Sequence, residues 1–471
     1  MAYKAITTTN ELQQRKSLAG VSPGLRRFIK QPEVDSASAA DEDVPFTVII
    51  YLLILHAPLM LIFLRVPWIA TVHSVAILLL GLYYLINDKQ PMRVSWVVAY
   101  IAGAELLWRG VDASLVWEYG KYAVLILSIL ILLKYRGKAT IWPVLFMLLM
   151  VPGIMIMPSF NRQDVAFQLA GPVALAAASM AFSTVEFKKN DLQRLFLAII
   201  APSLAMAILI AFNVGTQDIS FSGGGANEAV SEGIGANQVT SVLSLGSMAA
   251  FYYIFLAGKD LRVRSLMIGL FIFFVGASVL TFSRAGLWNT IGALMAGVFF
   301  LFIDRRRTLA TMGVVLILGL VSYFIIFPWI NNRTNGEVLV RFKDTDSTGR
   351  DLLFKVDYQL FLDNPVWGVG VGQSPYYHIA VFGYKKNTHT EYSRLLAEHG
   401  SFGVAVIVLM AAVLIARAVQ RRSNTSKAIS VSFTIWALLY MAHSSTLLVA
   451  PSFMFGVAAA HFLSKENEAK A

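Results

Sequence analysis

Residues 193–213 read QRLFLAIIAPSLAMAILIAFN, in which an arginine near the start precedes an unbroken run of uncharged, mostly apolar residues. A helix needs about 20 such residues to cross the hydrocarbon core of a lipid bilayer. Comparable runs occur at about 45–64, 67–86, 94–108, 115–133, 139–157, 165–185, 238–257, 265–283, 286–303, 308–328, 400–416, 428–445 and 447–463. They predict an all-α polytopic membrane protein with about 12–14 transmembrane helices.

The composition agrees with this prediction. Hydrophobic residues make up 57% of the 471 residues and charged residues only 14%, whereas about a quarter of a soluble globular protein is charged. Most of the outer surface must therefore face something other than water. This excludes an ordinary cytoplasmic enzyme, a disordered protein and a nucleic-acid-binding domain. The chain has no cysteine, which excludes disulfides, iron–sulfur clusters and thiolate zinc sites.

Lysine and arginine alternate between successive connections of the predicted helices. The richer connections hold Lys89 and Arg93, Lys134 to Lys138, Lys188 to Arg194, Lys259 to Arg264, Arg305 to Arg307, and Arg417 to Lys427. The intervening short connections hold one arginine each, namely Arg65, Arg109, Arg162 and Arg284. The positive-inside rule places the richer set and both termini in the cytoplasm. This asymmetry accounts for most of the net charge of +11 without a nucleic-acid partner.

The apolar runs and the connections divide the chain into five predicted segments. These are a disordered cytoplasmic tail (1–44), a transmembrane bundle (45–328) with an outer glycine-rich loop (214–237), a large outer loop (329–399), C-terminal transmembrane helices (400–463) and a short cytoplasmic tail (464–471). The last two apolar runs are separated only by His443-Ser444-Ser445. They form either two spans or a re-entrant hairpin.

Arginines on the outer side are the first candidate site residues. Arg284 lies between two apolar runs, where an ionisable side chain either serves a function or reaches toward the headgroups. Thr348 is the predicted N-cap of a short helix that carries Arg350 in its first turn. A cation such as Arg350 is unfavourable at the positive end of a helix. The guanidinium group and the helix end together, however, suit a bound phosphate. Arg341 and Arg394 are weaker candidates, and Asn237 opens the helix after the glycine-rich loop.

His389 is the candidate proton acceptor. Thr388 and Glu391 match a capping box, which makes His389 the first residue of a helix entering the membrane. The positive end of that helix disfavours an imidazolium, so we expect a neutral ring that can accept a proton. The alternative is an ordinary histidine at the membrane interface.

The sequence predicts no metal and no cofactor. Asp344-Thr345-Asp346 is a D-x-D pattern that can hold a divalent cation, but acidic residues in a basic loop usually offset charge. Trp367 to Gln373 (WGVGVGQ) lacks the spacing of a dinucleotide-binding fingerprint. The histidines show no metal-ligand spacing.

Several of these motifs together resemble the bacterial O-antigen ligase and polymerase superfamily. Its signature is a histidine, a small polar residue, nine positions and Gly-x-x-Gly, matched here by His389, Thr390 and the stretch Gly400 to Gly403. Further similar elements are Thr348-Gly349-Arg350, Asn364 to Gly370, Ser283-Arg284-Ala285-Gly286 and Gly233 to Gln238. The resemblance covers about 220–403 in consistent order.

The resemblance implies a GT-C-like glycosyltransferase in the bacterial inner membrane with its active site on the periplasmic side. The donor would be a glycan on undecaprenyl pyrophosphate and the acceptor another glycan or a lipid A core. The transfer would be inverting and independent of metal. His389, Arg284 and Arg350 would be catalytic, while Arg341, Arg394 and Asn237 would bind substrate. The remaining partners would be membrane lipids and a chain-length regulator.

The reaction stays open among a polymerase, a ligase and a protein-directed transferase. The glycine-rich loop holds no arginine, whereas many ligases have one there, and position 390 is threonine where ligases usually have asparagine, serine or glutamine. Both departures favour a polymerase of O-antigen or exopolysaccharide. The alternative outside the enzymes is a flippase for lipid-linked oligosaccharides. A flippase should concentrate its arginines near mid-membrane in two related halves, whereas here they gather in one outer loop.

Overall fold

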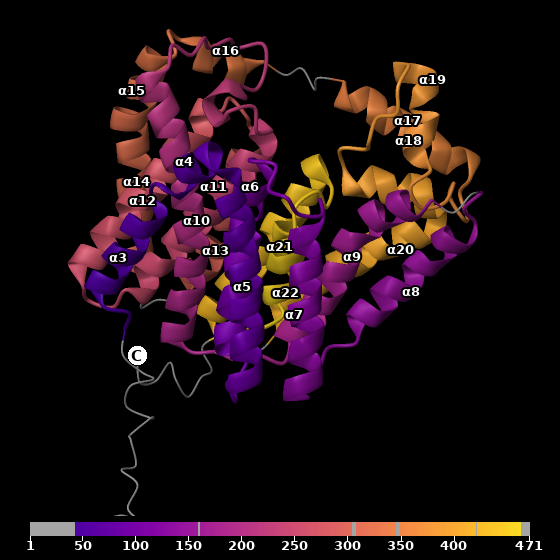
Figure 1. Ribbon diagram of the computed structural model, residues 1–471, viewed down its shortest axis with the longest axis horizontal. Helices are drawn as coiled ribbons and strands as arrows, with labels where there is room; N and C mark the ends of the chain where they lie inside the picture. Colours follow the sequence, from indigo (N-terminus) through magenta and orange to yellow (C-terminus); the bar gives the residue numbers. More distant parts are fainter. Residues whose placement is uncertain (1–42, 159–160, 304–307, 345–348, 421, 463–471) are drawn as a thin grey trace, which may run out of the picture. The chain divides into compact units, whose positions relative to one another are not determined.

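The structure is a computed structural model that describes residues 43–158, 161–303, 308–344, 349–420 and 422–462, and these are almost entirely helical (Figure 1). The helices are α3 (Phe46–His56), α4 (Leu59–Arg65), α5 (Pro67–Asn87), α6 (Met92–Arg109), α7 (Tyr119–Tyr135), α8 (Trp142–Met155), α9 (Arg162–Phe182), α10 (Lys189–Thr216), η1 (Ala229–Ser231), α11 (Ala236–Leu256), α12 (Leu261–Leu280), α13 (Ala285–Ile303), α14 (Thr308–Val321), η2 (Ser322–Ile326), α15 (Phe327–Arg333), α16 (Glu337–Lys343), α17 (Arg350–Asp363), α18 (Ser374–Tyr377), α19 (Ile379–Phe382), α20 (Glu391–Val419), α21 (Asn424–Ser444) and α22 (Ala450–Val457). The predicted tails, apart from Asp43 and Val44, and Thr345 to Thr348 lie outside the described residues.

Nine spans in the described part of the chain are long and apolar enough to cross a membrane. Helices α3 and α4 form one of them, and α14, η2 and α15 form another. The others are α5, α9, α10, α11, α12, α13 and α20, while α8 is apolar but shorter. Large apolar side chains such as Leu79, Met295 and Leu316 are exposed on the outer helices, as a lipid environment requires. The predicted all-α polytopic membrane protein is confirmed.

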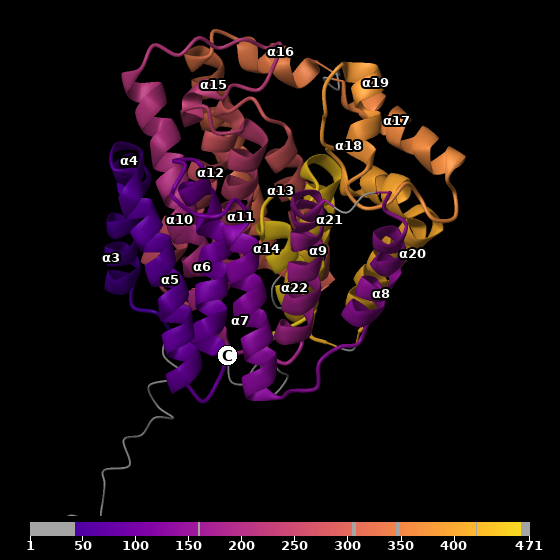
Figure 2. The same ribbon diagram turned by 45° about the vertical axis from the view of Figure 1, so that its right-hand side comes forward.

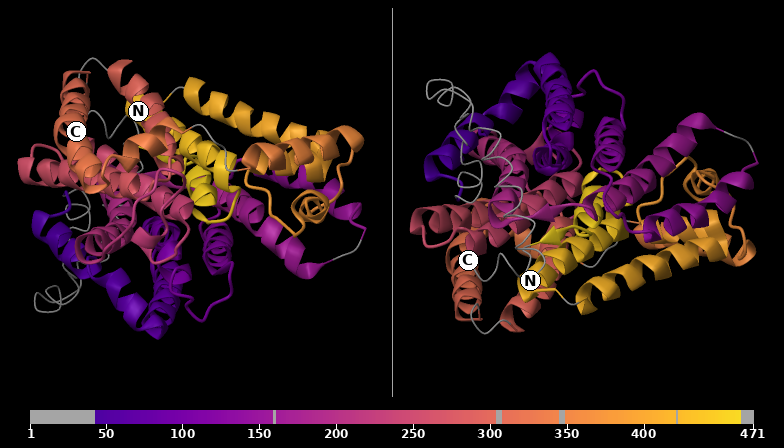
Figure 3. Two further views of the ribbon diagram at one scale, coloured as in Figure 1. Left: turned by 90° about the horizontal axis from the view of Figure 1, so that it is seen from above. Right: turned by 90° about the horizontal axis from the view of Figure 1, so that it is seen from below.

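Helix α11 forms the centre of the bundle. Of its apolar stretch, 94% is buried, and it packs against α10, α12 and α13. Gly286 permits the close approach of α13, because a Cβ at this position would lie 2.3 Å from the carbonyl oxygen of Thr240. The first turn of α13 is thereby held against α11, next to Arg284. In Figure 3 the yellow C-terminal helices lie between these magenta core helices and the orange α20.

The helix at the C-terminal end bears on whether the last two apolar runs form two spans or a re-entrant hairpin. Helix α22 has eight residues and is about 12 Å long, which is too short to span. Ser452 on α22 donates to the carbonyl of Gly171 on α9 at 2.8 Å. The described residues then end in β2 (His461–Phe462), which pairs in parallel with β1 (Glu186–Phe187). Within the described residues, this run therefore holds the short helix α22, which packs against α9, and the two-residue strand β2.

Candidate active site

Three arginines from three different segments meet at one end of the bundle. Arg284 lies in the turn between α12 and α13, Arg341 lies in α16, and Arg350 begins α17. Arg341 donates from Nε to the carbonyl of Phe282 at 3.0 Å and pairs with Asp344 at 3.0 Å. Arg284 donates to the carbonyl of Asp344. The end of α16 is thus bound to the turn that carries Arg284.

Arg350 completes this cluster. Burial lowers the pKa of Arg350, and the positive charges of Arg284 and Arg341 lower it further. The three guanidinium groups therefore act on one another, which is unfavourable in a protein alone and favourable once an anion is bound. Arg284 and Arg350, both expected to be catalytic, thus belong to one cluster.

Asn237 orients the turn that presents Arg284. Its side-chain oxygen accepts from the hydroxyl of Ser283 at 2.7 Å. Phe282 just before has a φ of 56°, an uncommon conformation for an aromatic residue. The strained turn is held from one side by Asn237 and from the other by the bond from Arg341 to Phe282. Asn237 therefore lies next to the arginine cluster.

His389 lies beside the same cluster. Burial, followed by the charges of Arg350 and Lys386, lowers the pKa of His389 to about 4. Such a pKa keeps the ring neutral near pH 7, as expected, but its largest cause is burial and not the end of a helix. Helix α20 begins at Glu391, with Thr390 as the N-cap whose side chain accepts from the backbone N–H of Tyr392 at 3.2 Å. His389 precedes the helix, and burial has the largest effect.

The predicted capping box of Thr388 and Glu391 is also wrong. The hydroxyl of Thr388 lies 3.4 Å from the carboxylate of Asp357 on α17, so it is drawn into the outer loop. Glu391 instead pairs with Arg394. The helix start moved because these buried partners compete with the local backbone for the two side chains.

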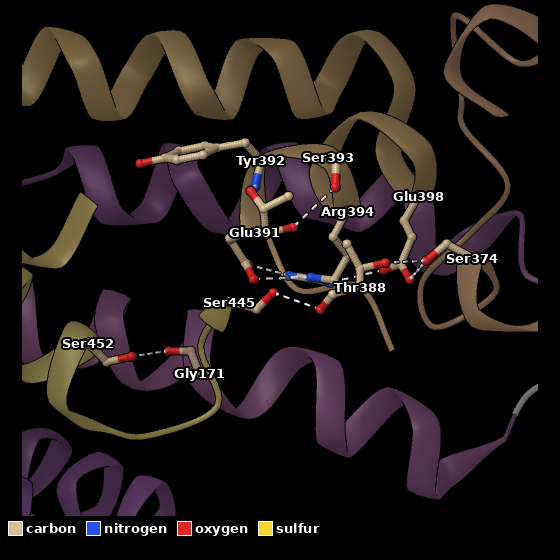
Figure 4. A network of polar contacts seen from close by, with 11 residues as sticks. Gly171, Ser374, Thr388, Glu391, Tyr392, Ser393, Arg394, Glu398, Ser445 and Ser452 are labelled. Atoms are coloured by element: carbon tan, nitrogen blue, oxygen red, sulfur yellow. Dashed lines mark hydrogen bonds and ion pairs between the residues drawn. The ribbon is translucent and has the colours of Figure 1, made fainter. Parts of the chain in front are cut away.

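Arg394 does not have the role expected from the sequence. Its side chain is 1% exposed and lies between Glu391 and Glu398, with 2.9 Å to the latter (Figure 4). Glu398 also accepts from Ser374 at 3.0 Å. A cation that is buried between two carboxylates already has its counter-charge. We therefore exclude Arg394 from the candidate phosphate ligands and assign it to the stability of α20.

His443 was missed by the sequence reasoning. Its ring lies within electrostatic reach of Arg350 and His389. Asn289 donates to Nε2 of His443 at 3.1 Å, and Nδ1 lies 2.9 Å from the hydroxyl of Ser444. Because an amide nitrogen only donates, the proton of His443 is on Nδ1. The polar corner after an apolar run was the available signal, but it predicted a turn and not a site.

Residues 268–408 match the family model described as O-antigen ligase. Over these residues the chain is similar to the O-antigen ligases, in agreement with the expected resemblance. The matched region contains Arg284, Arg341, Arg350 and His389, so the cluster lies within the part that carries the similarity. No curated protein matches the chain. Together with the nine candidate spans, the match indicates a multi-pass membrane protein with a region of the O-antigen ligase type.

The Gly-x-x-Gly stretch from Gly400 to Gly403 makes a sharp bend. Helix α20 is interrupted at Gly400, which has φ 56° and ψ −131°. A Cβ at Gly400 would lie 2.7 Å from the backbone of Gly368 and Val366, and one at Gly403 would lie 1.9 Å from the carbonyl of Leu395. The motif therefore serves the fold, because it lets two backbone segments pass at close range.

The glycine-rich loop packs on the arginine-bearing helix of the O-antigen ligase region. The backbone N–H of Gly223 donates to the carboxylate of Glu337 at 2.7 Å. A Cβ there would lie 2.6 Å from Val340. The first of the three glycines thus binds a carboxylate of α16 and positions Arg341 in the next turn.

Metal binding by the D-x-D pattern gains no support. Asp344 pairs with Arg341, whereas Thr345 and Asp346 lie outside the described residues. Among the residues that the structure describes, no group of three or more His, Cys, Asp or Glu side chains could hold a metal ion.

A buried ion pair fixes the outer loop behind His389. His378 and Asp357 are both fully buried, with Nε2 2.9 Å from the carboxylate, and Nδ1 of His378 bonds to the carbonyl of Lys386. Burial alone would lower the pKa of His378, but the bonds to Asp357 and Lys386 outweigh burial and raise it. Both ring nitrogens face acceptors, so we assign an imidazolium.

We expect the stability of this loop to decrease with rising pH. A raised pKa in the folded state gives a stabilisation that is complete below about pH 6.5, the unfolded value, and is lost as the pH rises through the folded pKa. Proteolysis of the outer loop between pH 5.5 and 9 measures this. Asp357→Asn keeps the shape and removes the charge, so it should flatten the pH dependence. An unchanged pH dependence in that variant contradicts the assignment.

Proposed function

We propose that the protein is an inverting, metal-independent glycosyltransferase that transfers or polymerises a glycan carried on undecaprenyl pyrophosphate at the periplasmic face of the inner membrane. The observation that carries the proposal is the gathering of Arg284, Arg341 and Arg350 beside the neutral His389. A diphosphate is the leaving group that such a cluster suits, because guanidinium groups bind phosphate bidentately and remain charged when desolvated.

In the proposed reaction His389 accepts the proton of the acceptor hydroxyl. The oxygen attacks the anomeric carbon of the donor from the face opposite the diphosphate, and the bond from that carbon to the diphosphate oxygen breaks. Arg284 and Arg350 stabilise the charge that develops on the leaving group. Arg341 adds its charge while it holds the end of α16, and Asn237 holds the turn of Arg284. The guanidinium groups supply the positive charge that a metal supplies in other transferases.

The donor itself should adjust the base. Arg350 is among the causes that keep the pKa of His389 at about 4, and a bound diphosphate neutralises that charge. We therefore expect the pKa of His389 to rise when the donor binds. A stronger base is then present only in the complex that reacts.

Arg350→Gln should both slow the reaction and move its pH profile. Removing the charge of Arg350 raises the pKa of His389 in the free enzyme, so the acid limb of kcat/KM should move upward from about pH 4. The rate should fall by about 10²- to 10³-fold. Rates of the purified enzyme between pH 3.5 and 8 measure both effects. Arg350→Lys keeps the charge and loses the bidentate bonds, so its rate should fall without the shift. An unmoved limb in Arg350→Gln contradicts the electrostatic link.

A reconstituted reaction tests the proposal against a flippase. Purified protein is mixed with an undecaprenyl-pyrophosphate-linked glycan and a second glycan as acceptor, with and without a chelator. We expect a longer glycan and free undecaprenyl pyrophosphate in equal amounts, at a rate that the chelator does not change. Relocation of an intact donor across a vesicle membrane with no release would identify a flippase and overturn the proposal.

A further inference from the structure

A cationic cavity, separate from the arginine cluster, lies at the end of α20 that is remote from His389. It encloses about 490 Å³ between the start of α8, the last turns of α20 and the return after α22. Helices α8 and α20 lie side by side there (Figure 2). The cavity is lined in part by Lys138, Arg417 and Arg422, and none of its described lining residues is acidic. Such a concentration of cations suits an anion.

Two of these cations are held in place by the protein. Arg417 is 4% exposed, donates to the hydroxyl of Thr434 at 2.6 Å and to the carbonyl of Phe455 at 3.0 Å. Its guanidinium also lies over the ring of Phe455. Arg422 donates to the carbonyl of Ala460 at 2.8 Å. These partners are neutral, so neither charge is neutralised by them, whereas the buried Arg394 is paired with two carboxylates.

Thr140, Ser183, Gln420 and His461 also line the cavity, and the other lining residues are apolar. Ala412 and Ala416 lie one turn apart on the exposed side of α20, and their small side chains leave room beside the helix. Trp142 lines the cavity at the first residue of α8, and tryptophan is typical of the membrane–water boundary. The cavity thus joins a cationic end to an apolar wall that continues along a membrane-spanning helix.

We propose that this cavity binds the phosphodiester headgroup of an anionic phospholipid from the cytoplasmic leaflet. Lys138 and Arg422 lie in connections that the positive-inside rule places in the cytoplasm, and anionic lipids are enriched there. The headgroup contacts Lys138, Arg417 and Arg422, while the acyl chains lie along Ala412 and Ala416. The apolar wall favours a lipid over free phosphate, which has no apolar part to bury. This site is separate from the glycosyl-transfer site and does not depend on its chemistry.

Lipid-dependent stability of the full-length protein in detergent tests the proposal. The thermal midpoint is followed against phosphatidylglycerol, phosphatidylcholine and millimolar inorganic phosphate. We expect saturable stabilisation by phosphatidylglycerol alone. Each of Lys138→Gln and Arg422→Gln should weaken the apparent affinity about fivefold, and the double variant about 30-fold. Lys138 is exposed, so its variant tests the site even where Arg422→Gln disturbs the fold.

The matched control is Lys89→Gln with Arg93→Gln. It removes two exposed charges from the same predicted side, away from the cavity, and should leave the affinity within about twofold. An equal loss in this control would show non-specific attraction to charge and overturn the site. Equal stabilisation by inorganic phosphate, or by phosphatidylcholine, would overturn the assignment to an anionic lipid.

Discussion

Replacing His389 by alanine is expected to lower turnover by about 10²- to 10⁴-fold, the usual contribution of a positioned general base. The ring is neutral near pH 7, because burial and the charges of Arg350 and Lys386 hold its pKa at about 4. Alanine removes the proton acceptor and leaves the arginine cluster in place. The measurement is the rate at which undecaprenyl pyrophosphate is released by purified protein at equal amounts of folded enzyme.

Chemical rescue separates this role from a structural one. Added imidazole should restore part of the turnover of His389→Ala, because a free base can enter the space that the side chain leaves. Added imidazole should not restore the turnover of Arg350→Gln, because this variant lacks a positive charge and still has its base. Turnover of His389→Ala equal to that of the unchanged protein would refute the assignment of His389 as the base.

The largest expected effect on stability is that of Gly400→Ala. Its backbone conformation at φ 56° and ψ −131° is one that residues with a Cβ avoid, at a cost of about 1–3 kcal/mol. The new Cβ would also lie 2.7 Å from backbone atoms of Val366 and Gly368, which cannot give way as a flexible side chain does. From the backbone strain and the clash together, we expect the free energy of unfolding to fall by about 4 kcal/mol or more. The yield of folded protein and the thermal midpoint in detergent measure this.

Gly383→Ala is the matched control for this substitution. Gly383 also has a positive φ of 77°, but nothing lies within 4 Å of a Cβ there. It should cost only the local backbone strain, about 1–2 kcal/mol. If Gly400→Ala were as stable as Gly383→Ala, the bend would not require glycine, and the Gly-x-x-Gly motif would need a role at the substrate instead.

Several local elements of the site could be predicted. The sequence predicts a short helix that carries Arg350 in its first turn, and α17 begins at Arg350. The start of the helix after His389 was misplaced by two residues, because the sequence does not show that Thr388 is drawn to Asp357, 31 residues earlier. The pattern of a capping box was present, but a buried carboxylate provided a stronger partner for its first residue.

Arg394 illustrates the same limit for charge. The sequence shows a cation next to the candidate base, and both of its acidic partners are visible at three positions before and four after. This spacing is equally common on solvated helix surfaces, where such pairs contribute little. Only the burial of Glu391, Arg394 and Glu398 shows that the two carboxylates neutralise the charge of the arginine. His443 is the opposite case, because its neighbours Asn289 and Arg350 lie far away in the chain.

The sequence by itself determined the class of protein, the apolar spans, and the placement of Arg341, Arg350 and His389 in one loop between apolar runs. These are properties of length, hydropathy and local charge, which are set by the order of residues. Tertiary packing alone decided that Arg284, Arg341 and Arg350 act on one another, that Arg394 is neutralised, that His443 joins the cluster and that Gly400 bends α20. Each of these features depends on which segments, distant in the sequence, pack together away from water. A buried charge or carbonyl there needs a partner from another segment.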